Sequence, residues 1–220
     1  MKRELTSLDL KYLISELEFL KDARIDKIYQ DYAEKTRRNL RIRLYSRGLG
    51  SFEIFCASGR FHLTKHQREG NEKPTNFSMF LRKYLKNKRI QEIKQNEFER
   101  IVEIVFEDCT LIIELFHTSN YILINNQGKI IGAFEYQKWS DRTIAPGKDY
   151  EYPPSSSFYD DVMSFKRQAL SSPRDVFSFV ANLGFGKEYT KMILDEMTID
   201  KNEQIQTLGE ENILKLYEKC

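Results

Sequence analysis

The sequence is poor in cysteine and has no long apolar run, and each shortage excludes a class of protein. Among 220 residues there are three cysteines, Cys56, Cys109 and Cys220. An odd, widely spaced set does not suit a disulfide framework and is typical of free thiols in a reducing compartment. No apolar run approaches the roughly 18 residues that span a bilayer, and the N-terminal residues lack the apolar region of a secretory signal. We therefore expect a cytoplasmic protein without a membrane partner.

An excess of charge of one sign is also missing. Lys and Arg total 35 and Asp and Glu total 33, which gives a formal net charge of +2 at pH 7. Affinity for nucleic acid would therefore have to come from a local basic patch. With 40% hydrophobic and 31% charged residues, the chain can form a core under a well-hydrated surface.

The first two thirds of the chain alternate polar and apolar residues. A stripe of leucines between Leu10 and Leu20, preceded by Thr6 and Ser7 as capping residues, predicts a leading helix. A second helix is predicted for residues 74–87. The remaining runs have the period of two that is typical of strands, and short turns join them. They are residues 24–30, 39–46, 51–56, 60–64, 89–95, 98–106, 110–116, 121–125 and 129–136. Consecutive hairpins of this kind predict a mostly antiparallel sandwich or barrel.

A change of composition marks a domain boundary near residues 146–157, where three of the five prolines precede a run of serines. We place the boundary between a domain of residues 1–152 and a helical region of residues 153–220. In that region Ser172 and Pro173 predict a helix start, with a cap and a proline at the first position. The last helical pattern continues to Cys220, so we expect the chain to be part of something longer.

Residues suited to metal binding or nucleophilic catalysis are scarce. His62 and His66 are four apart on a predicted strand and its exit, His117 stands alone, and no Cys-x-x-Cys pair occurs. No G-x-S-x-G elbow is present. We therefore expect no metal, no cofactor and no catalytic residue.

One glycine-rich stretch is compatible with anion binding. Gly184 and Gly186 precede Lys187 at the start of a predicted helix, where unpaired N–H groups and the helix dipole attract anions. The spacing does not match a phosphate-binding loop. A turn between two helices that needs glycine for its geometry explains the same residues.

A basic run is the clearest unaided signal for nucleic-acid binding. Six cations and one acid, Glu92, lie between Arg82 and Lys94. We expect the first five cations to form a basic patch that neutralises several phosphates: Arg82, Lys83, Lys86, Lys88 and Arg89. The alternative is an ordinary solvated helix face. A second set of arginines supports nucleic acid: Arg37, Arg38, Arg41, Arg43 and Arg47.

An acid and a base, Glu99 and Arg100, stand side by side at the start of an apolar strand. Neighbouring residues of a strand point to opposite faces. A purely solvated pair would need both faces exposed to water, which is expected only at a strand end. The residues alone therefore leave open whether the pair is functional or simply exposed.

Six blocks of sequence, in order, resemble the NFACT N-terminal domain of the RqcH/NEMF proteins of ribosome-associated quality control. These proteins are also catalogued as fibronectin-binding protein A homologues, and the sequence resembles the archaeal branch more than the Gram-positive one. The blocks are "LTSLDLKYLISEL", "ARIDKIYQ", "PTNFSMFLRKYL", "RIQEIKQNEFERIVEIVF", "NYILINNQGKIIGAF" and "APGKDYEYPP".

The resemblance implies an α+β fold: an antiparallel β-sandwich with a leading helix, similar to the N-terminal domain of formamidopyrimidine-DNA glycosylases. Residues 173–217 would form a helix-two-turn-helix-like region. It also implies an RNA-binding adaptor rather than an enzyme. Its partners would be tRNA and the obstructed large ribosomal subunit with stalled peptidyl-tRNA, and it would support mRNA-independent alanine tailing.

The resemblance also implies functional residues, and each is assigned to the position of this sequence that matches it. An acid in the first helix corresponds to Asp9, and an Asp-Arg pair corresponds to Glu99-Arg100, where this sequence has Glu in place of Asp. Arg100 would contact RNA phosphate or sugar, and Asp9 and Glu99 would orient it. We expect the pair at an exposed rim of the fold.

Two rival functions remain from other classes. A glycosylase-like DNA- or RNA-processing enzyme would need an N-terminal proline amine, but this sequence begins Met1-Lys2-Arg3-Glu4 and has no proline before Pro74. We expect no Schiff-base lyase chemistry. A fibronectin-binding adhesin fits poorly with the free cysteines and the absent signal region.

Overall fold

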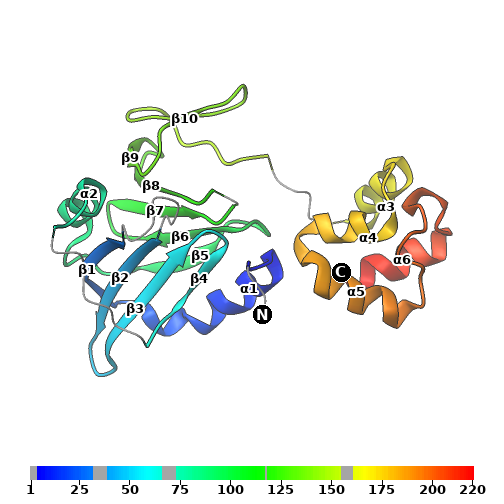
Figure 1. Cartoon of the computed structure of the whole chain (residues 1–220), viewed down its shortest axis with the longest axis horizontal. Helices are drawn as coiled ribbons and strands as arrows, with labels where there is room; N and C mark the ends of the chain where they lie inside the picture. The colour runs from blue at the N-terminus through cyan, green and yellow to red at the C-terminus, as the bar shows by residue number, and fades with distance from the viewer. Residues whose placement is uncertain (1–3, 32–38, 66–72, 117, 155–160) are drawn as a thin grey trace. The chain divides into compact units, whose positions relative to one another are not determined.

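A computed structural model describes residues 4–31, 39–65, 73–116, 118–154 and 161–220 (Figure 1). The chain divides into two compact units. The first runs from Asp9 to Pro153 and includes the residues before Thr6, and the second runs from Pro154 to Cys220 and includes Thr6–Leu8. None of the helices in the described ranges has the length and apolar character that a membrane span requires.

The first unit begins with a four-stranded antiparallel sheet in chain order, β1-β2-β3-β4. Strands β2 and β3 pair in continuous register, and Ile42 lies opposite Ile54 of β3 on one side and Ile28 of β1 on the other. The strands confirm the alternating patterns that predicted them. Their bounds are β1 (Arg24–Asp31), β2 (Asn39–Ser46), β3 (Gly50–Ala57) and β4 (Arg60–Leu63).

A second antiparallel sheet has five strands, again in chain order. The β8–β9 turn contains Gly128 at φ 75°, a backbone angle that glycine adopts without steric cost. The predicted hairpins of this region are confirmed. The bounds are β5 (Glu92–Gln95), β6 (Ile101–Val105), β7 (Cys109–Glu114), β8 (Asn120–Asn125) and β9 (Ile130–Ala133).

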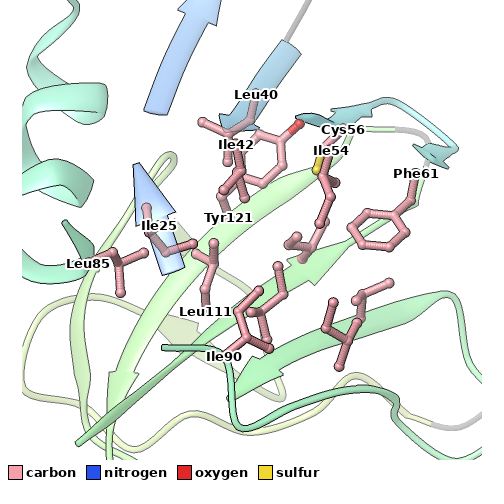
Figure 2. Close-up of a cluster of buried hydrophobic side chains, with 14 of the residues drawn as sticks. Ile25, Leu40, Ile42, Ile54, Cys56, Phe61, Leu85, Ile90, Leu111 and Tyr121 are labelled. Atoms are coloured by element: carbon pink, nitrogen blue, oxygen red, sulfur yellow. The ribbon is translucent and has the colours of Figure 1, made fainter. Parts of the chain in front are cut away.

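The core lies between the inner faces of the two sheets. Alternation along β2 buries Leu40, Ile42 and Leu44 completely. Figure 2 shows side chains of the first sheet, such as Ile42, gathered with Leu111 and Tyr121 of the second. This arrangement confirms the predicted α+β fold with an antiparallel β-sandwich.

Two helices contribute buried residues to the core of the first unit. The leading helix is α1 (Ser7–Glu16), and a short 3-10 turn, η1 (Glu18–Leu20), follows it. Helix α2 (Asn76–Leu85) begins where the Thr75 hydroxyl accepts a hydrogen bond from the Ser78 N–H at 2.9 Å. Leu81 and Leu85 on its inner face are fully buried.

The outer face of the second sheet is also covered, which the sequence did not predict. Two short strands, β10 (Gln137–Lys138) and β11 (Thr143–Ile144), form a small separate sheet. Ile144 joins a second apolar cluster with Ile101, Ile112 and Ile122 of the large sheet. Residues 137–144, for which the sequence predicted no element, thus contribute to the packing of the sandwich.

Buried polar contacts hold this covering segment in place. The Arg142 guanidinium donates to both carboxylate oxygens of Glu114, at 2.7 and 3.2 Å, and both side chains are less than 10% exposed. Tyr150 donates its hydroxyl to Glu114 at 2.8 Å, and Tyr152 donates to Glu103 at 2.6 Å. Such bidentate, charge-assisted hydrogen bonds fix geometry as well as adding stability.

The second unit is helical, as the sequence predicted, but its helix starts differ. The first of its helices, α3, was not predicted, and the N-cap before α4 is Asp175 rather than Ser172. Asp175 is the N-cap because its carboxylate accepts a hydrogen bond from the Ser178 N–H at 2.7 Å. The elements are α3 (Val162–Ser171), α4 (Val176–Val180), η2 (Ala181–Phe185), α5 (Gly186–Met197), η3 (Ile205–Thr207) and α6 (Glu210–Lys219).

The contacts of Tyr150 predict a loss of stability at alkaline pH. Burial first, and then the neighbouring Glu114 carboxylate, raise the pKa of the Tyr150 phenol well above its usual value. In the unfolded chain the phenol ionises near pH 10. The stabilisation is therefore complete below about pH 10 and is lost as pH rises above it. Chemical denaturation measures the free energy of unfolding at each pH. Above about pH 10, this free energy should fall less steeply with pH in Tyr150→Phe than in the wild type. The same slope in both proteins would contradict this.

Candidate RNA-binding site

The pair Glu99-Arg100 lies in the turn between β5 and β6, not at the start of a strand. Strand β6 begins one residue later, at Ile101. The Glu99 N–H donates to the Asn96 carbonyl at 3.0 Å, and the side chain of Gln95 donates to the Glu99 carbonyl at 2.8 Å. The prediction of a strand start was wrong because these local bonds turn the chain before pairing with β7 begins.

Arg100 extends from this turn and contacts an acid and an aromatic ring. Its Nη1 donates to Oε2 of Glu4 at 3.2 Å. Its guanidinium carbon lies 5.7 Å from the centroid of the Phe116 ring, within cation–π range. The backbone carbonyl of Arg100 accepts from the Leu115 N–H at 2.9 Å. Two turns of the second sheet therefore position one guanidinium.

Glu4 is a site residue that the sequence reasoning missed. The Leu5 N–H donates to the Gly59 carbonyl at 2.7 Å, which brings the segment before α1 against the β3–β4 turn. A Cβ atom at Gly59 would lie 2.6 Å from Cγ of Glu4, and Gly59 has a φ of 64°. Only glycine suits that position. No local motif could reveal the contact between residues 4 and 100, because the fold alone brings them together.

One of the two other predicted acids, Glu99, is less accessible than Arg100. The Arg100 side chain is 29% exposed, as expected for a rim, whereas Glu99 is only 6% exposed. The expectation of an exposed pair is therefore wrong for Glu99. Asp9 is half-buried in the first turn of α1. Of the adjacent pair, Arg100 is therefore the residue that is better placed to reach a ligand.

The predicted basic patch divides into neutralised and accessible cations. Lys88 forms an ion pair with Asp108, and its hydrogen bond lowers the pKa of that carboxyl group. Lys94 pairs with Glu103 at 3.6 Å. Arg89 is exposed and donates to the Asp22 carbonyl at 3.2 Å. Part of the positive charge in this run is therefore matched within the protein.

The cations of helix α2 have different surroundings. Lys83 is exposed, with its ammonium 5.5 Å from the centroid of the Tyr84 ring, and Lys86 is exposed at the helix end. Arg82 is half-buried and donates its Nε–H to the Ile28 carbonyl at 2.7 Å. Helix α2 thus presents two lysines to solvent while Arg82 is directed against β1.

The second arginine set is only partly a surface feature. Arg41 is 1% exposed and pairs with Glu53 at 3.2 Å, while Arg43 reaches the other oxygen of the same carboxylate at 3.3 Å. Arg47 is exposed in the β2–β3 turn. Arg37 and Arg38 lie outside the described residues. The register of β2 and β3 places Arg43 opposite Glu53, which explains the pairing of these two residues.

Lys187 is found at the start of α5, in the second unit. Gly184 and Gly186 both have positive φ, 99° and 70°, so the hairpin does need glycine for its geometry. Lys187 also lines a groove of about 810 Å³ together with Lys191 and Asp195. The acids and lysines of this groove are mixed, and a role in phosphate binding stays a prediction.

Metal ligands do not gather within the described ranges, where no group of three or more His, Cys, Asp or Glu residues could hold an ion. Nδ1 of His62 lies 2.9 Å from the Leu63 carbonyl, and His66 and His117 lie outside the described residues. Cys56 and Cys109 are buried free thiols, and burial raises the pKa of Cys109 to about 12. Such thiols are poor nucleophiles.

The fold that these observations define is an α+β fold: a β-sandwich with a leading helix, together with a separate helical unit. The family of NFACT N-terminal and middle domains matches residues 6–220. This chain belongs to that family, as its sequence blocks suggested.

Relatives extend this assignment across organisms. The archaeal Rqc2 homolog aRqcH of Methanocaldococcus jannaschii is 32% identical over 239 residues, covering 99% of this chain but 34% of that protein. The NEMF homolog of the ribosome quality control complex in Drosophila melanogaster is 35% identical over 131 residues, covering 56% of this chain and 13% of that protein. The chain therefore spans about a third or less of these relatives.

Solved structures confirm the fold. The N-terminal domain of the fibronectin-binding protein PavA from Streptococcus pneumoniae superposes with a TM-score of 0.70 at 27% identity, covering 88% of this chain and 81% of that one. The formamidopyrimidine-DNA glycosylase of Lactococcus lactis has a TM-score of 0.51 at 16% identity, covering 94% and 75%. The second likeness shows the fold alone.

The exposure of Arg100 predicts a small role in stability. An exposed ion pair contributes about 0–1 kcal/mol, and Glu4 in this pair is 49% exposed. Arg100→Ala should therefore lower the free energy of unfolding by less than about 1 kcal/mol. Urea denaturation checks this, with Arg142→Ala as the matched control, since breaking a buried pair costs roughly 3–5 kcal/mol. A loss at Arg100 as large as at Arg142 would show that Arg100 is structural.

Proposed function

We propose that this chain is the RNA-binding adaptor domain of a ribosome-associated quality control protein. It binds tRNA at an obstructed large ribosomal subunit and supports mRNA-independent alanine tailing of the stalled chain. Family membership supports the proposal, because the relatives in archaea and animals are named as Rqc2 homologs and quality control subunits. Arg100, Asp9 and Glu99 are its functional residues, and Lys187 is a further phosphate contact.

The single observation that favours an RNA role is the environment of Arg100. Its guanidinium is held from one side by Glu4 and over the Phe116 ring, yet it remains partly exposed. A guanidinium oriented in this way is suited to bidentate contact with phosphate, because its planar fork matches the spacing of two oxygens of one phosphate group. Glu4 takes the orienting role that we had assigned only to Asp9 and Glu99.

The domain acts by binding and not by catalysis in this proposal. The large ribosomal subunit makes the peptide bond, and the domain positions tRNA for it. A nucleic-acid-processing enzyme is the rival function, and only a likeness of fold stands behind it. Incubation with damaged duplex DNA and borohydride trapping separates the two, since a covalent adduct requires an amine nucleophile. A trapped adduct would replace the adaptor proposal.

The accessible lysines of α2 should contribute to the salt dependence of tRNA binding. Each phosphate contact adds roughly 0.7–0.9 to the log–log slope of affinity against salt. Lys83→Gln/Lys86→Gln should therefore flatten the slope by roughly 1.4–1.8 in filter-binding titrations.

The matched control removes the same charge from Lys88 and Lys94. These lysines are paired with Asp108 and Glu103, so Lys88→Gln/Lys94→Gln should change the slope less. Equal slopes in the wild type and the Lys83/Lys86 variant would refute the role of α2 in binding.

A further inference from the structure

Three guanidinium groups surround the ring of Tyr29 in the first unit. The guanidinium carbons of Arg41, Arg43 and Arg82 lie 5.0, 5.4 and 5.3 Å from the ring centroid. All three are within the distance at which a cation is attracted to an aromatic ring. Tyr29 belongs to β1, the first two arginines to β2 and the third to α2, so three elements build this arginine cluster.

A buried acid fixes two members of the arginine cluster. Oε1 of Glu53 accepts from Arg41 at 3.2 Å and Oε2 accepts from Arg43 at 3.3 Å. The Glu53 side chain is fully buried. One carboxylate is therefore shared by two guanidinium groups, and it holds both of them in place.

Arg82 brings a third positive charge to the same ring. Its Nε–H donates to the Ile28 carbonyl, and its Nη1 lies 3.8 Å from the Met79 sulfur, a weak acceptor. Within the part of the chain that the structure describes, no carboxylate forms an ion pair with Arg82. Arg82 therefore adds a positive charge beside the two arginines that share Glu53.

The members of the cluster differ in depth. The Arg41 side chain is 2% exposed, whereas that of Arg43 is 20% exposed and Arg82 is half-buried. Like charges repel more strongly in a partly buried setting than in water. An anion that reached Arg43 and Arg82 would offset this repulsion and would meet guanidinium groups that are already positioned.

We infer that the Tyr29 arginine cluster binds a phosphodiester group of an RNA backbone. Arg43 and Arg82 contact the phosphate, while Tyr29 and Glu53 act as positioning residues. An RNA backbone fits better than a small free anion because exposed Lys27 and Lys83 continue the positive surface along β1 and α2. The inference rests on the proposed function and adds a second contact to that of Arg100.

Filter binding of tRNA tests the inference in the full chain. Arg43→Gln/Arg82→Gln should weaken binding at least about tenfold at about 0.15 M salt and flatten the salt slope by roughly 1.4–1.8. Arg167→Gln/Arg174→Gln removes two exposed arginines from the second unit and should change affinity less than about twofold.

Wild-type affinity in the first variant would overturn the inference and leave the proposed function intact. No tRNA binding by the wild type would overturn both.

A second measurement uses the wild-type protein and does not depend on how the variants fold. NMR signals of the arginine Nε–H groups are followed during titration with a short oligouridylate RNA. The signals of Arg43 and Arg82 should shift and saturate while those of Arg167 and Arg174 stay in place. Unmoved Arg43 and Arg82 signals would overturn the inference. So would equal shifts with inorganic phosphate at matched phosphate concentration, which would indicate a small-anion site instead.

Discussion

The apolar contact between the two sheets is the constraint on which the rest of the first unit depends. Alternating side chains such as Ile42 and Leu111 are fully buried between the sheets, so a shift of one residue in register would expose them. The same register places the β3–β4 and β5–β6 turns where Glu4 meets Arg100 and where Leu5 bonds to Gly59. The candidate site is thus a consequence of sandwich packing.

Charge is handled in two ways around this core. Some ion pairs are buried and structural, as in Arg142 with Glu114 and Arg41 with Glu53. Removing one partner of such a pair leaves an uncompensated charge, so these residues are poor candidates for ligand contacts. Other cations, among them Arg100 and Arg82, are oriented by the fold and remain partly accessible. Total charge says little about binding in this chain, whereas the depth and partner of each cation say much more.

The sequence predicted the fold well where the pattern is local. The alternation of polar and apolar residues predicted β2 and β3, and capping residues with apolar residues at helical spacing predicted α1 and α2. It failed where long-range contacts decide. Strand β10 has two residues and no periodic signal, yet its segment is held by Tyr150 and Arg142 against Glu114. The site shows the same division: the family resemblance pointed to the adjacent Glu99 and Arg100, but nothing in the sequence pointed to Glu4. The sequence likewise could not show that Arg41 is buried, because its burial depends on the pairing of β2 with β3.

The account depends most on Arg100 as an RNA contact that folding does not need. The most direct test is the amount of tRNA that co-purifies with the full-length protein from cells, measured against large-subunit rRNA by RNA sequencing. With Arg100→Ala, the ratio of tRNA to rRNA should fall while the protein remains folded and ribosome-bound, and Arg167→Ala should leave it unchanged. An unchanged ratio with Arg100→Ala would contradict the account.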